Sequence, residues 1–95
     1  MKLDVWDLLI DDVNREKMHA HGVSVRQAFE IVDERPRLLR NDSEEGAPFL
    51  LVGPDKGGTF LTLPIDPTAE YGTWRPRTGY PSKPNDVARY EQSRS

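Results

Sequence analysis

The alternation of hydrophobic and polar positions predicts a short strand and then a helix at the start of the chain. Leu3–Trp6 alternates apolar and polar side chains, which is typical of a half-buried strand. Asp7 fits the N-cap of a helix over residues 8–20, because its carboxylate can accept a hydrogen bond from an unpaired amide of the first turn. The apolar stripe of this helix is narrow, so we expect it to lie on the surface with one edge buried. The residues expected to share one face are Leu9, Val13 and Lys17.

The segment His19–Ser24 predicts a tight hinge between this helix and a second one. Gly22 is expected to end the first helix, because glycine adopts positive φ without strain. Ser24 fits the N-cap of the second helix, and Gln27 stands three residues later, as a capping box requires. Pro36 is expected to end this second helix. Its predicted apolar face consists of Val25, Ala28, Phe29 and Val32.

The second half of the chain changes to runs of strand-forming residues separated by turn-forming residues. Strands are expected at Arg37–Arg40, Pro48–Val52, Thr59–Ile65 and Glu70–Arg77. Turns are expected at Asp55–Gly58, which has the composition of a hairpin turn, and at Asp66–Ala69. Pro76 would place the end of the last strand at an edge or a bulge. A short helix over about residues 84–92 completes the pattern.

These elements predict an α+β fold in a single domain over residues 1–95. It would contain a short N-terminal strand, a two-helix hairpin, a three- to four-stranded antiparallel sheet and a short C-terminal helix. Helices gathered on one face of such a sheet are a common two-layer arrangement. The other face of the sheet would then be exposed, and a functional site would be sought there.

Composition and charge narrow the class of protein. The 95 residues include no cysteine, which excludes a disulfide scaffold and a thiolate zinc site. The start of the chain lacks the apolar run of a signal peptide, and no stretch has the roughly 18 apolar residues of a membrane span, so a cytoplasmic protein without a membrane segment is expected. The net charge of −3 disfavours a dedicated nucleic-acid binder. From Thr73 onward, however, five basic residues stand against two acidic ones, which indicates a local basic face.

The segment Tyr71–Tyr80 concentrates the groups best suited to bind RNA. Arg75 and Arg77 are two residues apart, so in a strand both side chains would start from the same face and form a fork suited to phosphate. The simpler alternative is a pair of edge-strand arginines that form surface salt bridges with acidic residues of the helices. Tyr80 could stack on a base or supply a phenolic proton.

Other candidate motifs favour structural roles. His19 and His21 are two residues apart and cannot share a helix face, so no metal site is expected. Lys56 precedes Gly57 and Gly58, but this segment lacks the spacing of a phosphate-binding loop and does not lead into a helix, so a hairpin turn is favoured. The helix hairpin superficially resembles a DNA-binding helix-turn-helix. Its second helix disfavours that function, because it carries one basic reader, Arg26, among three acidic residues.

With these residues placed, the chain resembles the BrnT family of toxins of bacterial type II toxin–antitoxin pairs, within the wider RelE-like ribonuclease group. The most specific part of the resemblance is the His21–Ser24 hinge. The other matching positions are Trp6, Asp7, Asn14, Lys17, Ala28, Val32, Pro36, Phe49–Gly53, Gly57, Gly58, Arg77 and Ala88–Tyr90.

The resemblance implies a metal-independent endoribonuclease without a cofactor, which cleaves mRNA by attack of a 2′-hydroxyl on the adjacent phosphate. It also implies a cognate antitoxin protein, encoded beside the toxin, that covers the exposed sheet face. The candidate catalytic residues are Arg77, Arg75, Tyr80 and Lys56. The candidate RNA-binding residues are Arg75, Arg77, Lys83 and Arg89. Arg77 is the best match to the sheet arginine of the family.

An alternative function is a non-catalytic interaction module of the same fold, either a degenerate toxin or a regulatory subunit. BrnT-like chains usually carry an arginine just before the central strand and another after the hairpin glycine, whereas this chain has Pro48 and Thr59. The acidic net charge also favours the non-catalytic alternative.

Overall fold

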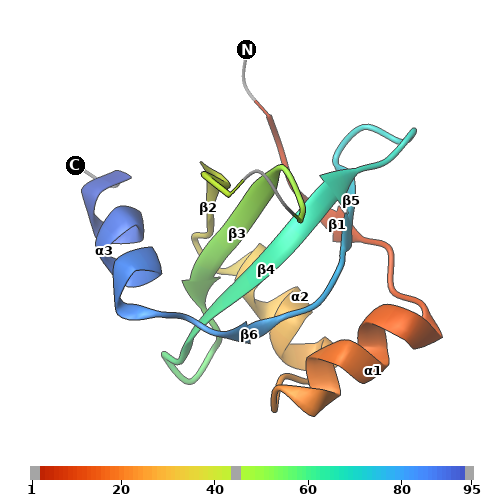
Figure 1. The fold of residues 1–95 in the computed structure, drawn as a ribbon, viewed down its shortest axis with the longest axis horizontal. Helices are drawn as coiled ribbons and strands as arrows, with labels where there is room; N and C mark the ends of the chain where they lie inside the picture. The colour runs from red at the N-terminus through yellow and green to blue at the C-terminus, as the bar shows by residue number, and fades with distance from the viewer. Residues whose placement is uncertain (1–2, 44–45, 94–95) are drawn as a thin grey trace.

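The computed structural model describes residues 3–43 and 46–93, which form an α+β fold of three helices around one mixed sheet (Figure 1). The helices are α1 (Asp12–Ala20), α2 (Val25–Asp33) and α3 (Pro84–Ser93). The strands are β1 (Asp7–Leu8), β2 (Arg37–Arg40), β3 (Phe49–Pro54), β4 (Phe60–Pro67), β5 (Thr73–Pro76) and β6 (Tyr80–Pro81). The fold class expected from the sequence is therefore confirmed.

The sheet is larger than expected and is not purely antiparallel. Its strands lie in the order β1-β5-β4-β3-β2, and β6 pairs with the same strand, β4, as β5 does. Strands β2 to β5 form the expected antiparallel meander. At its edge β1 pairs in parallel with β5, which makes the sheet mixed. The predicted four-stranded antiparallel sheet is therefore present, but the prediction missed β6 and the parallel pairing of β1, because two-residue strands leave almost no pattern in a sequence.

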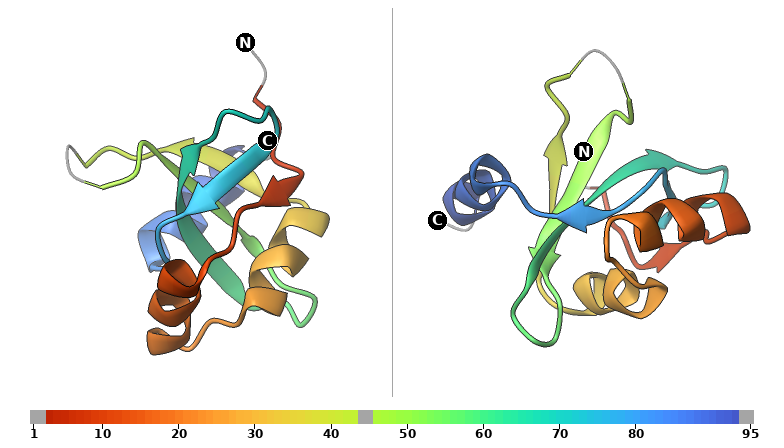
Figure 2. Two further views of the ribbon diagram at one scale, coloured as in Figure 1. Left: turned by 90° about the vertical axis from the view of Figure 1, so that its right-hand side faces the viewer. Right: turned by 60° about the horizontal axis from the view of Figure 1, so that its bottom comes forward.

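The helices cover both faces of the sheet, which corrects the expectation that they gather on one face. Side chains of a strand alternate between the two faces. In β3, Leu51 belongs to the core under α1 and α2, whereas Leu50 and Val52 pack on the opposite side with Tyr90 of α3. The ring of Tyr90 lies edge-on against Phe60 with centroids 5.1 Å apart. Figure 2, right, shows α3 separated from α1 and α2 by the strands.

The first helix begins later than predicted. Its N-cap is Asp11 rather than Asp7, and Asp11 forms a reciprocal capping box with Asn14. The buried residues of α1 are Asn14 and Met18. The predicted face was therefore wrong: the exposed residues include Leu9, Val13 and Lys17. Leu9 lies outside the helix because its amide donates to the carbonyl oxygen of Trp74 in β5.

The predicted N-terminal strand is displaced toward the first helix. Leu3–Trp6 forms no strand, and β1 consists of the next two residues, Asp7 and Leu8. The amides of Trp6 and Asp7 both donate to the carbonyl oxygen of Gly72, which fixes where pairing with β5 begins. Leu8 is the residue of this N-terminal segment that is buried in the core. Its burial therefore favours the observed register, in which β1 is formed by Asp7 and Leu8.

The second helix and the hairpin turn agree with the sequence prediction. Ser24 caps α2 and forms the expected capping box with Gln27. Gly22, at φ 80°, follows the C-cap His21 and so ends the first helix, as predicted. Asp55 closes the β3–β4 turn, because its amide donates to the carbonyl oxygen of Thr59 and its carboxylate accepts the amide of Thr59.

The strand boundaries near the predicted Asp66–Ala69 turn differ from the prediction. Strand β4 continues to Pro67, and β5 begins at Thr73 rather than Glu70. The turn lies further along the chain because the hydroxyl of Thr68 donates to the carbonyl oxygen of Thr73. Asp66 is consequently a strand residue opposite Arg75, a position that matters for the site described next.

Candidate functional site

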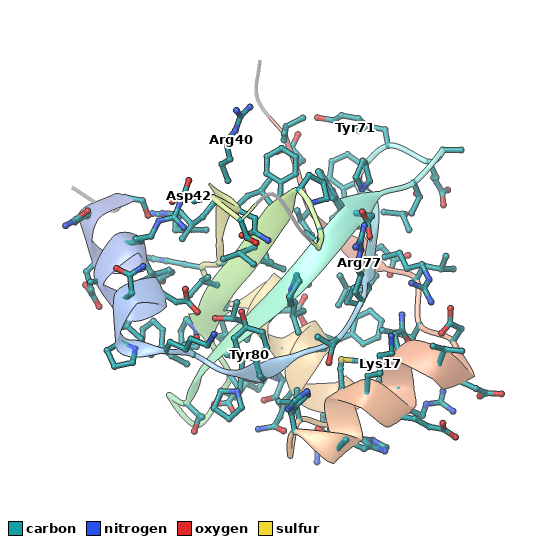
Figure 3. The ribbon with its side chains drawn as sticks, in the orientation of Figure 1. Lys17, Arg40, Asp42, Tyr71, Arg77 and Tyr80 are labelled. Carbon is teal, nitrogen blue, oxygen red and sulfur yellow. The ribbon has the colours of Figure 1, made fainter. Side chains whose placement is uncertain are left out.

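A groove of about 480 Å³ opens on the α3 side of the sheet, where that helix leaves the strands uncovered. Leu50 of β3 and Pro64 of β4 are cross-strand neighbours and both line it. Its sides come from the loop after β2, from the segment that joins β5 to α3 and from α3 itself. Figure 3 shows Asp42, Arg77 and Tyr80, which come from the first two of these segments, around β3 and β4. The exposed sheet face expected from the sequence is therefore present, although α3 covers part of it.

Four of the candidate site residues line this groove, namely Arg77, Tyr80, Lys83 and Arg89. Two others do not: Arg75 and Lys56. Lys56 lies in the β3–β4 turn, where its side chain is exposed and its amide donates to Glu30 of α2. Arg94 lies outside the described residues. The groove therefore brings together four of the six predicted site residues and does not include Arg75 and Lys56.

Arg77 is oriented by a two-point ion pair with Asp66. Its Nε lies 2.7 Å from Oδ2 of Asp66, and its Nη2 lies 3.0 Å from Oδ1. The hydrogen bond from Arg77 to Asp66 raises the pKa of this guanidinium. Its main-chain amide also donates to the carbonyl oxygen of Pro64 at 2.8 Å. An arginine has five N–H donors, so the remaining ones can still bind an anion in the groove.

The two arginines of the predicted fork bind different carboxylates. In the register of β4 and β5, Arg75 stands opposite Asp66, so both arginines start from the same sheet face, as predicted. The Nη2 of Arg75, however, lies 2.8 Å from Oδ2 of Asp11, the N-cap of α1. Arg75 therefore ties α1 to the sheet, as the simpler alternative held, and the predicted phosphate fork is not formed.

Tyr80 supplies a phenol at the floor of the groove. Burial, with a smaller contribution from the negative charge of Asp86, raises the pKa of Tyr80 above its ordinary value of 10.0. The phenol is therefore protonated at neutral pH and can donate a hydrogen bond. The Nζ of Lys83 lies 5.5 Å from the centroid of its ring, and the ring of His21 lies edge-on to it with centroids 6.4 Å apart.

The other basic residues of the groove are Lys83, just before α3, and Arg89 within α3. Arg89 donates from Nη2 to the carbonyl oxygen of Arg40 at 2.8 Å, and its Nη1 lies 3.9 Å from Oδ2 of Asp42. Asp86 is buried and accepts a hydrogen bond from Oγ1 of Thr62 at 3.0 Å. These contacts anchor α3 on β4 and β2 and so hold its basic side chains beside the groove.

Sequence reasoning missed two polar groups of the groove. Thr78 has a buried Oγ1 without a hydrogen-bond partner within residues 3–43 and 46–93, and it lies between Arg77 and Tyr80 in a lining segment. No sequence signal marks it. Asp86 stands three residues after Lys83, the spacing of an acidic capping residue, and this signal could have placed it at the start of α3.

The described residues contain no group of three or more histidine, cysteine, aspartate or glutamate side chains that could hold a metal ion. In the same part of the chain, no helix has the length and apolar character needed to cross a membrane. His19 and His21 are both exposed.

Comparison with known proteins adds no identification to this geometry. No family model matches the chain, and neither the curated proteins nor the solved structures contain a match. The groove itself is therefore the basis for a functional assignment.

Proposed function

We propose that the groove binds RNA and that the protein is a metal-independent endoribonuclease, the toxin of a type II toxin–antitoxin pair. The observation that carries this proposal is the convergence of Arg77, Tyr80, Lys83 and Arg89 on one groove. These residues come from segments separated by up to twelve positions, and each was a candidate on sequence grounds alone. The BrnT-like hinge and the antiparallel meander support the RelE-like arrangement that the resemblance implies.

The chemistry of the groove supports RNA cleavage by attack of the 2′-hydroxyl. In this reaction the 2′-hydroxyl loses its proton to water and its oxygen forms a bond to phosphorus, while the bond to the 5′-oxygen breaks and that leaving oxygen takes up a proton. Arg77 and Lys83 provide positive charge for the pentacoordinate phosphate, where a single oriented donor contributes roughly 3 kcal/mol. Tyr80 holds its proton at neutral pH and fits the donor to the leaving oxygen.

The position of the groove fits the rest of the proposal. An antitoxin that covers the open sheet face would bury the groove and block RNA, so inhibition needs no conformational change. A toxin that cleaves mRNA and is neutralised by an antitoxin would act in the cytoplasm.

Expression of the protein alone in a bacterial host tests this function. We expect growth arrest and fragmentation of cellular RNA, both lost in Arg77→Ala. Arg75→Ala is the matched control, because it removes the same charge from the same segment but outside the groove. Normal growth with intact RNA on expression of the unaltered protein would refute the proposal.

A second candidate, the non-catalytic interaction module, is favoured by the carboxylates beside the groove arginines. Asp66 binds Arg77 and Asp42 lies near Arg89, so part of the positive charge is neutralised within the chain. The net charge of −3 also disfavours binding of polyanions. If the protein is such a module, its expression alone should leave growth normal. A protein encoded beside this chain should still bind it.

A further inference from the structure

The large hydrophobic side chains that are exposed among the described residues gather along one edge of the molecule, away from the groove. They are Leu3, Trp6, Leu9, Val13 and Tyr71, with exposed fractions of 37%, 58%, 49%, 57% and 58%. Four of them belong to the segments that flank β1, and Tyr71 belongs to the turn before β5. We call these five residues the β1 edge surface. Figure 2, left, views the molecule from this edge, with β1 beside β5 and α1 below them.

The two aromatic residues of the β1 edge surface are held in place although they are exposed. The indole of Trp6 lies so close to Gly72 that a Cβ at this glycine would collide with the ring. The rings of Trp6 and Tyr71 meet edge-to-face with centroids 5.3 Å apart. The hydroxyl of Tyr71 donates to Oδ2 of Asp4 at 2.9 Å. Rigid exposed aromatics lose little conformational entropy on binding, which is a property of interface anchor residues.

An apolar pocket of about 190 Å³ lies beside these aromatics. The apolar side chains that line it are Leu3, Phe49, Pro67, Tyr71 and Trp74. Two acidic residues, Asp4 and Glu70, also line it. The pocket therefore suits an apolar side chain that arrives together with positive charge.

The charges around the β1 edge surface are predominantly negative. The exposed acidic residues of the neighbouring segments are Asp7, Asp12, Glu16 and Glu70. Two of the nearby cations are paired within the chain, Arg15 with Asp12 and Arg75 with Asp11. The others are Lys17 of α1, which is exposed, and Arg37, which lies beside Leu3 and Asp4, so acidic residues still outnumber basic ones here. This field repels nucleic acid and attracts a basic partner. The β1 edge surface thus differs in charge from the groove, which collects the basic residues.

A partner protein is not expected to bind at this edge by adding a strand beside β1. The amide of Asp7 donates to Gly72, just before β5, and the amide of Leu9 donates to Trp74 of β5. The amide of Leu8 between them donates to Oδ1 of Asp7. The main-chain donors of β1 are therefore satisfied within the chain, and recognition must use side chains.

We propose that the β1 edge surface docks a basic amphipathic segment of a partner protein. An apolar side chain of that segment fills the pocket beside Tyr71, further apolar side chains pack on Trp6, and lysines or arginines face the acidic residues. This inference concerns a surface distinct from the groove and does not depend on RNA cleavage.

Titration of the isotopically labelled protein with three synthetic helical peptides, followed by NMR, tests the proposal. The first peptide carries leucines and a tryptophan on one face and lysines on the other. The second replaces each lysine with glutamate, and the third replaces the apolar residues with serine. We expect binding of the first peptide alone, with shifted amides at Trp6, Tyr71 and Gly72.

Variants connect this binding to the surface. Tyr71→Ser and Glu70→Lys alter exposed side chains, and each should weaken binding of the first peptide about tenfold, as expected of an anchor and of a facing charge. Arg77→Ala should bind it as the unaltered protein does. The proposal fails if the lysine peptide does not bind, if the glutamate peptide binds equally, or if Tyr71→Ser has no effect. It also fails if single-stranded RNA shifts the same amides, or if dilution alone shifts them, which would indicate a second copy of the chain.

Discussion

Asn14 shows how one buried polar side chain can hold two elements together. Its Nδ2 donates to the carbonyl oxygens of Leu9, at 3.0 Å, and of Pro76, at 2.9 Å. Its Oδ1 accepts the amide of Asp11, the N-cap of its own helix. The side chain is fully buried, and its hydrogen bond to Pro76 is buried as well, so this carbonyl oxygen would lose its partner without access to water if Asn14 were removed.

Asn14→Ala is therefore expected to lower the free energy of unfolding by about 3 kcal/mol, because it removes these hydrogen bonds and leaves the buried carbonyl oxygen of Pro76 unpaired. Lys17→Ala changes an exposed residue of the same helix and should stay within about 0.5 kcal/mol of the unaltered protein. Urea denaturation measures both. Equal effects of the two substitutions would contradict the role assigned to Asn14.

Tyr80 is predicted to act through its hydroxyl. Tyr80→Phe keeps the ring but removes the proton donor, so it should slow RNA cleavage by about 10²-fold or more while leaving RNA binding nearly unchanged. Because the pKa of Tyr80 is raised above 10.0, loss of its proton should not reduce the cleavage rate below that pH. Single-turnover cleavage of an RNA oligonucleotide, measured across the pH range, checks both expectations. An unchanged rate in Tyr80→Phe would remove Tyr80 from the catalytic residues.

At the scale of single residues, the sequence predicts side-chain direction better than side-chain partners. The spacing of Arg75 and Arg77 correctly places both on one sheet face. It carries no information about Asp11 and Asp66, which bind them, because these contacts join segments far apart in the chain. Thr78 could not be singled out for the same reason: only the folded chain leaves its hydroxyl buried and unpaired.

Among the elements, α1 depends on the ionised carboxylate of Asp11. The amide of Asn14, followed by the side chain of Arg75, lowers the pKa of this carboxyl below its ordinary value of 3.8. A group whose pKa is lowered by folding stabilises the folded state fully above its ordinary pKa and loses that effect as the pH falls through the lowered value. A hydrogen bond from Gln27 lowers the pKa of Asp55 in the same direction.

We therefore expect the free energy of unfolding to fall as the pH is lowered below about 4. Asp11→Asn can still cap the helix, but it has no charge to lose, so its stability should depend less on pH in this range. Urea unfolding at a series of pH values compares the two proteins. Parallel pH profiles would show that Asp11 does not contribute in this way.

The elements that were predicted well are those whose signals lie close together in the chain. The capping box of α2 and the β3–β4 turn are local patterns, and both were placed correctly. The start of α1 was misplaced because several acidic residues, from Asp7 to Asp12, can each serve as an N-cap. Pairing of β1 with β5 decides among them, and that pairing joins residues more than sixty positions apart.

On the scale of the whole molecule, the chain has two surfaces of opposite character, and this would allow an acidic chain to present the proposed RNA site. The basic side chains Arg77, Lys83 and Arg89 line the groove. Acidic and aromatic side chains gather instead at the β1 edge surface. The sequence indicated the basic half through its charge distribution, but the edge surface could not be predicted, because Trp6 and Tyr71 were both expected to lie in strands.

The central claim is that the groove, and not the basic segment as a whole, binds RNA. Its most direct test is the affinity of the purified protein for a fluorescent single-stranded RNA, 2′-O-methylated to prevent cleavage, at several salt concentrations. Arg77→Ala should weaken binding and reduce the salt dependence by about one ion, whereas Arg75→Ala should leave both unchanged. Equal losses in the two variants, or an affinity that neither substitution alters, would contradict the assignment of the groove.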